Sequence, residues 1–81
     1  MKNINNLYAT KQLIKIRKSQ KISQPEMADL LTVLTGDKIS ASLYQKWEQG
    51  SLGVTPSKAL SIAKALETSV KDIWTTKKNV K

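Results

Sequence analysis

The 81-residue sequence contains no cysteine, no histidine and no phenylalanine, and it has only three glycines and two prolines. Without cysteine the chain forms neither a disulfide nor a thiolate metal site. Without histidine it lacks the commonest general base and the commonest zinc ligand. Six scattered Asp and Glu residues remain, and no glycine-rich phosphate loop is present. We therefore expect neither an enzyme nor a bound metal or cofactor.

Long hydrophobic runs are also absent. No segment approaches the length needed to span a membrane, and no hydrophobic signal segment opens the sequence. These features predict a cytoplasmic, nucleoid-associated protein without a membrane partner. A chain of this length has room for one small core, so a single domain is expected.

Acidic residues are few relative to basic ones. Fourteen Lys and Arg face six Asp and Glu, which gives a formal net charge of +8. Residues 1–25 contain six basic groups and no acidic one, and the final "TTKKNVK" adds three lysines. This imbalance favours a polyanionic partner, which could be DNA, RNA or an acidic membrane surface.

The apolar periodicity predicts an all-α fold of five helices with short connections and no strand. We expect a flexible arm at residues 1–6, a domain at 7–74 and a basic tail at 75–81. The predicted helices cover residues 7–19, 24–34, 41–49, about 56–66, and a short segment that follows Ser69 and includes Ile73 and Trp74. In the first helix, Leu13 and Ile16 define the buried stripe, and the remaining faces are assigned to Lys11, Lys15, Arg17 and Lys18.

Helix boundaries are marked by capping residues. Ser23 and Glu26 have the spacing of a capping box, with Pro25 in the first turn, and Gly36 is a plausible stop. Ser40, Thr55 and Ser69 are further N-cap candidates, the last with Asp72 three residues later. The residues expected on buried helix faces are Met27, Leu30, Leu31, Leu34, Ile39, Tyr44, Trp47, Ala59, Leu60, Ile62, Ala63 and Leu66.

The segment "ISASLYQKWEQG" is unusually polar for one that carries a tryptophan. A helix that reads DNA needs a few bulky anchors on one face and small or hydrogen-bonding residues on the face that enters the major groove. Trp47 fits the anchor, and Gly50 ends the helix. The alternative interpretation is an ordinary amphipathic surface helix.

The segments "ISQPEMADLL" and "SASLYQKWEQG" together resemble the lambda-repressor-like helix-turn-helix domains, also called the Cro/repressor or xenobiotic-response-element type. The family features are Ser-Gln-x-Glu followed by a hydrophobic residue and Ala at a helix start, and Trp-Glu-x-Gly at the end of the recognition helix. "ALSIAKALETSVKDIW" is similar to the two closing helices of the family. The resemblance covers residues 13–74 and implies a compact five-helix domain.

The resemblance also implies a function. Such a protein would be a sequence-specific regulator of transcription that binds double-stranded operator DNA, as in a small Cro-like repressor of a phage or mobile element. It would act as a homodimer on DNA. Base contacts are expected from Ala41, Ser42, Gln45 and Lys46, and phosphate contacts from Gln24, Ser40, Gln49 and Lys58.

The sequence departs from the family pattern at three places. Ala41 stands where the family often has a long polar residue, and it could contact only a thymine methyl group. The run "TVLTGDK" is several residues longer than usual, which we interpret as one extra turn of the second helix and a longer connection around Gly36. Lys21 stands where glycine is common after the first helix, so no glycine relieves a left-handed backbone there.

Two further functions are compatible with the sequence. The first is a protein-interaction module on the same fold, such as an antirepressor or an antitoxin partner, which would bind DNA weakly and without sequence preference. The second is a binder of RNA or acidic lipid that uses the lysine-rich first helix, although lysines on a solvated helix face are common.

Overall fold

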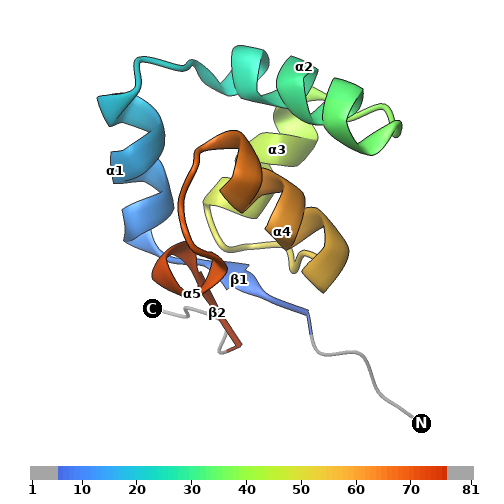
Figure 1. Cartoon of the computed structure of the whole chain (residues 1–81). Helices are drawn as coiled ribbons and strands as arrows, with labels where there is room; N and C mark the ends of the chain where they lie inside the picture. Colours follow the sequence, from blue (N-terminus) through green and yellow to red (C-terminus); the bar gives the residue numbers. More distant parts are fainter. Residues whose placement is uncertain (1–5, 77–81) are drawn as a thin grey trace, which may run out of the picture.

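The computed structural model describes residues 6–76, which form five helices and a small two-stranded sheet (Figure 1). The helices are α1 (Lys11–Ser19), α2 (Gln24–Thr35), α3 (Ala41–Glu48), α4 (Pro56–Ala65) and α5 (Val70–Ile73), and the strands are β1 (Tyr8–Ala9) and β2 (Trp74–Thr75). The prediction of a five-helix domain is confirmed. Residues 1–5 of the expected arm and 77–81 of the expected tail lie outside the described residues.

The first helix begins later than predicted, because residues 7–9 pair with distant parts of the chain. Tyr8 lies opposite Thr75, and Ala9 lies opposite Trp74, in an antiparallel sheet. Leu7 and Val54 exchange backbone hydrogen bonds of 2.8 Å in both directions. The expectation of no strand was therefore wrong, and so was the assignment of Trp74 to the last helix. These partners are remote in sequence, so local periodicity could not reveal them.

Most predicted caps are present. The Ser23 hydroxyl accepts from the Glu26 backbone N–H, and the Glu26 carboxylate accepts from the Ser23 N–H. Ser40 caps α3 and Thr55 caps α4 through their hydroxyl groups. The predicted capping box at Ser69 does not form, because its side chain accepts no cap hydrogen bond and the single turn of α5 closes through the backbone.

The core lies where α2, α3 and α4 meet, and α1, α5 and the strands close it from the other side (Figure 1). Its largest fully buried side chains are Leu13, Met27, Leu31, Tyr44, Val54, Ile62, Leu66 and Ile73. The Trp74 indole N–H donates to the Ala59 carbonyl at 3.1 Å, which anchors β2 against α4.

Three leucines predicted to be buried are exposed instead. Leu30, Leu34 and Leu60 expose 37%, 52% and 46% of their surface. In α2 the buried residues are Met27, Ala28 and Leu31. The small side chain at Ala28 belongs to the packed face, so this face is rotated away from Leu30 and Leu34. These leucines therefore lie beside the core and contribute little to it.

The turn between α1 and α2 carries backbone strain at Lys21. Its φ is +60°, in the left-handed region that non-glycine residues rarely adopt. The Lys21 N–H donates to the Lys18 carbonyl at 2.9 Å, so the strained residue belongs to the hydrogen-bonded end of α1. Lys21, which stands where glycine is common in the family, is therefore itself the residue with the left-handed backbone.

Candidate nucleic-acid interface

Helices α2 and α3 form a helix-turn-helix unit with a long turn. α2 continues to Thr35, so the extra turn predicted from "TVLTGDK" is confirmed. Gly36 follows in the left-handed conformation with φ +79° and ends the helix. The Thr32 hydroxyl accepts from the Ile39 N–H at 2.9 Å. This bond ties the start of α3 to α2 and holds the longer connection in place.

The two sides of α3 differ sharply in chemistry. Tyr44, Trp47 and Glu48 are buried, and Trp47 exposes only 7% of its surface. The prediction that Trp47 is a packed anchor is therefore confirmed. The outward residues Ser42, Gln45, Lys46 and Gln49 are all exposed, and none of them is acidic. This side presents hydrogen-bonding groups and one cation, as a surface that meets base edges and phosphates requires.

The two residues at the start of α3 have less freedom than their neighbours. Ala41 is half-buried and packs against the core, so little of its methyl group is available to a base. The Ser40 hydroxyl accepts from the Leu43 N–H at 3.1 Å and lies 3.4 Å from the Ser42 hydroxyl. Ser40 therefore acts first as a helix cap, and it would reach DNA through its remaining hydrogen-bonding capacity.

The other expected phosphate ligands differ in their surroundings. Gln49 is exposed at the C-terminal end of α3. Lys58, in the first turn of α4, pairs with Asp37 at 2.8 Å. An exposed pair of this kind contributes only about 0–1 kcal/mol, so a phosphate could displace Asp37. Gln24 is half-buried at the start of α2, and its Nε2 donates to Glu48 Oε1 at 2.8 Å.

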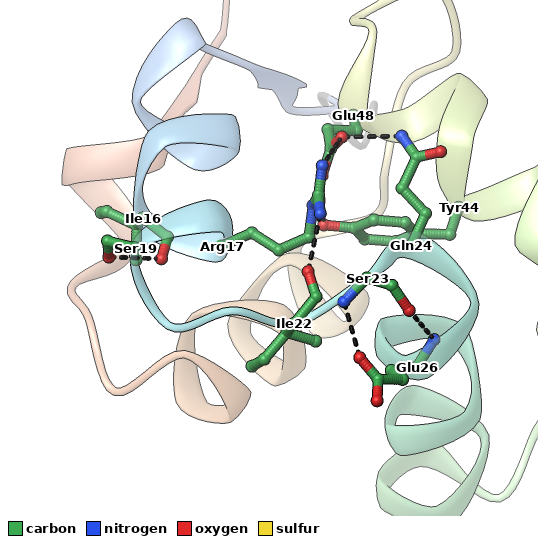
Figure 2. Close-up of polar contacts among 9 residues, drawn as sticks. All are labelled: Ile16, Arg17, Ser19, Ile22, Ser23, Gln24, Glu26, Tyr44 and Glu48. Atoms are coloured by element: carbon green, nitrogen blue, oxygen red, sulfur yellow. Dashed lines mark hydrogen bonds and ion pairs between the residues drawn. The ribbon is translucent and has the colours of Figure 1, made fainter.

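A buried ion pair lies directly behind Gln24 (Figure 2). Arg17 Nε and Nη2 donate to the two Glu48 carboxylate oxygens at 2.5 and 2.9 Å, and Arg17 Nη1 donates to the Ile22 carbonyl at 2.7 Å. The Tyr44 hydroxyl donates to Glu48 Oε2 at 2.8 Å. One carboxylate therefore accepts from α1, α2 and its own helix α3, and it links the three helices.

The assignment of Arg17 to an outer face was wrong. Arg17 and Glu48 expose only 6% and 4% of their surface. A signal for this was present in the sequence, since Arg17 follows the buried Leu13 by four residues and Glu48 follows Tyr44 by four. Residues with this spacing share one helix face. Two opposite charges on two buried faces can be accommodated only if they pair.

The pKa values reflect this arrangement. Burial alone would raise the pKa of the Glu48 carboxyl, but hydrogen bonds from Arg17, Gln24 and Tyr44 outweigh burial and lower it. The hydrogen bond to Glu48 raises the pKa of Arg17. Burial, together with the Glu48 charge, raises the pKa of the Tyr44 hydroxyl. Arg17 and Glu48 are therefore both charged and Tyr44 is neutral at physiological pH.

The fold and the polar side of α3 define a DNA-binding protein of the helix-turn-helix class. A helix-turn-helix family model matches residues 13–73. The chain belongs to this family, in its Cro/C1, lambda-repressor-like type. No curated protein and no solved structure matches the chain.

Membership in this family has direct consequences. The family is non-enzymatic, and its helix-turn-helix domain implies a DNA-binding regulator of transcription. Within residues 6–76, no helix combines the length and apolar character that crossing a membrane requires.

Proposed function

We propose that the protein is a small Cro-like repressor of phage or mobile-element type that acts in the cytoplasm, binds a double-stranded operator and blocks polymerase. The observation that carries the proposal is the polar side of α3. Its exposed residues oppose the buried Tyr44, Trp47 and Glu48, so the helix can lie in a major groove while its other side stays packed.

Base contacts would come from the exposed Ser42, Gln45 and Lys46. Lysine can donate to guanine O6 and N7, glutamine can form a bidentate pair with adenine, and serine is less selective. Ala41 would add at most a methyl contact, because it is half-buried. We therefore expect recognition to depend mainly on Gln45 and Lys46.

Phosphate contacts would come from residues around this helix. We propose Gln24, Ser40, Gln49 and Lys58 for this role, together with backbone N–H groups at the starts of helices. A homodimer would place two α3 helices on an operator with two-fold symmetry. Ile73 and Trp74 are buried within the chain, so the contact between the two copies would use other residues.

The base-reading role is tested by Lys46→Ala. We expect a loss of about 1–3 kcal/mol on the preferred site and a relaxed preference at one base pair. Lys64→Ala, which removes an exposed lysine from α4, is the matched control for the lost charge. If Lys46→Ala weakens binding to every DNA sequence equally, Lys46 contacts phosphate alone, and its role in base reading is contradicted.

One observation favours the alternative, a protein-interaction module such as an antirepressor or antitoxin partner. Leu30, Val33 and Leu34 are exposed along one side of α2, and Val33 exposes 80% of its surface. An apolar surface of this kind can bind another protein. This function would be favoured if DNA binding were weak and indifferent to sequence.

A further inference from the structure

We propose that Glu48 is a positioning residue for DNA binding: it holds the Gln24 side-chain amide in the single orientation that presents an N–H group to a backbone phosphate. The inference rests on the proposed function and adds to it a residue that never touches DNA. The observation behind it is the 2.8 Å hydrogen bond from Gln24 Nε2 to Glu48 Oε1.

A glutamine amide by itself does not favour one orientation. Its carbonyl oxygen accepts hydrogen bonds and its nitrogen carries two N–H donors, and a half-turn about the last side-chain bond exchanges them. A phosphate oxygen only accepts hydrogen bonds. An amide that turned Oε1 toward a phosphate would repel it. The contact therefore forms only after the amide has adopted one of its two orientations.

The Glu48 carboxylate removes this ambiguity. It too only accepts, so the Gln24 nitrogen must face it, and Figure 2 shows the nitrogen directed at Glu48 and the oxygen directed away. One N–H is used in this bond, and the second remains on the same nitrogen. Gln24 is half-buried and is the first residue of α2. This second N–H therefore lies at the N-terminal end of the helix, where the helix dipole favours anions.

The carboxylate itself is well suited to this role. Glu48 exposes 4% of its surface and accepts from Arg17, Tyr44 and Gln24, so it cannot rotate without breaking several hydrogen bonds. Its negative charge would repel a phosphate, but the Arg17 guanidinium is paired with it. Gln24 can therefore approach the DNA backbone with its orientation fixed and without a net negative charge behind it.

The test measures the contact with one phosphate at a time. Full-length protein binds its selected DNA site as a series of duplexes, each with one phosphate replaced by an uncharged methylphosphonate. The penalty at a position is the Kd on the modified duplex divided by the Kd on the unmodified one. At the phosphate bound by Gln24 we expect a penalty of about tenfold for the wild type, the size of one hydrogen bond to a charged group.

Three variants separate positioning from stability. Gln24→Met removes the donor, and the penalty at this phosphate should fall to about one- to twofold. The triple variant Arg17→Met/Tyr44→Phe/Glu48→Leu replaces the buried network by apolar side chains, which is often tolerated. Its penalty should fall by at least about twofold, because the freed amide again has two orientations, and it should stay above that of Gln24→Met, which has no donor. Tyr44→Phe removes a bond to Oε2 and leaves the bond between Oε1 and Gln24, so its penalty should stay at the wild-type level.

Circular dichroism and thermal melts establish that each variant is folded. If the triple variant is unfolded, Arg17→Met/Glu48→Leu, which also leaves no acceptor for Gln24 at position 48, takes its place with the same expected loss. A folded variant without the carboxylate that keeps the full penalty overturns the inference. So does a wild type that binds DNA but shows no phosphate whose penalty depends on Gln24, and in that case the proposed function stands. Failure of the wild type to bind DNA would instead refute the proposed function, and the inference with it.

Discussion

The buried ion pair between Arg17 and Glu48 leads us to predict a large loss of stability in the variant Arg17→Met. Methionine has a similar length and no charge, so the main effect is to leave the Glu48 carboxylate without its cation. The carboxylate exposes only 4% of its surface and would keep only the hydrogen bonds from Gln24 and Tyr44. Removing one partner of a buried pair costs about 3–5 kcal/mol, because an uncompensated charge stays in the interior.

That cost is large for this domain. About 0.05–0.15 kcal/mol per residue gives a total stability of roughly 4–12 kcal/mol for 81 residues. The variant would therefore lose between about a quarter and all of its stability at neutral pH. Replacing the network as a whole, in Arg17→Met/Tyr44→Phe/Glu48→Leu, should cost no more than about 2 kcal/mol, since no buried charge remains.

The pH dependence of stability provides a second, independent test of this prediction. In the wild type the pKa of Glu48 is lowered by folding. The charged carboxylate therefore stabilises the fold above the ordinary carboxyl pKa, and this stabilisation is lost as the pH falls through the pKa of Glu48 in the folded protein. In Arg17→Met burial should raise this pKa instead. The variant would then become more stable as the pH falls toward that of an ordinary carboxyl group, while the wild type would not.

Urea denaturation followed by tryptophan fluorescence measures both effects, because Trp47 and Trp74 are buried. The titrations are run at about pH 7 and about pH 5, because the variant should gain stability as the pH falls toward that of an ordinary carboxyl group. A loss below about 1 kcal/mol for Arg17→Met, the range of an exposed pair, would refute the reasoning. A loss that is the same at both pH values would refute the assignment to Glu48.

Three further predictions concern stability and are checked by urea titration or thermal melts. Leu34→Asp should change the free energy of unfolding by no more than about 0.5 kcal/mol, whereas Leu31→Asp at a buried position should unfold the domain; a large loss at Leu34 would mean that its side chain is packed. Lys21→Gly should stabilise the domain by about 0.5–1 kcal/mol, because glycine adopts a positive φ without strain, while Lys18→Gly within α1 should cost about as much. Trp74→Phe should cost about 1–2 kcal/mol through loss of the hydrogen bond to α4, and an unchanged stability would show that this bond is not needed.

Local features of the fold were predictable from the sequence. The caps Ser23, Ser40 and Thr55 and the stop at Gly36 depend on a few neighbouring residues, and all four are present. Features that depend on distant residues were not. Strand β1 forms because Val54, Trp74 and Thr75 lie beside residues 7–9, and no local pattern encodes that pairing.

In the candidate interface, too, local features could be predicted from the sequence and contacts between helices could not. The polar composition of residues 41–49 predicted which side of α3 is exposed, since Trp47 and its neighbours had to pack on the opposite side. The hydrogen bond between Gln24 and Glu48 joins residues from two helices, and it depends on how α2 packs against α3. Helical spacing placed Arg17 in line with Leu13 and Glu48 in line with Tyr44, but Arg17 was assigned to an outer face, and only the structure shows that the two residues are buried and meet.

The central claim is sequence-specific DNA binding through α3. The most direct test is to select bound sequences from random double-stranded DNA and to measure the affinity for the selected sequence as a function of salt concentration. We expect one sequence to emerge, with two-fold symmetry if a dimer binds. Each neutralised phosphate contributes about −0.9 to the slope of log affinity against log salt, so about three to ten contacts predict a slope between about −3 and −9. A pool that stays random after repeated selection, with a salt slope near zero, would contradict the claim.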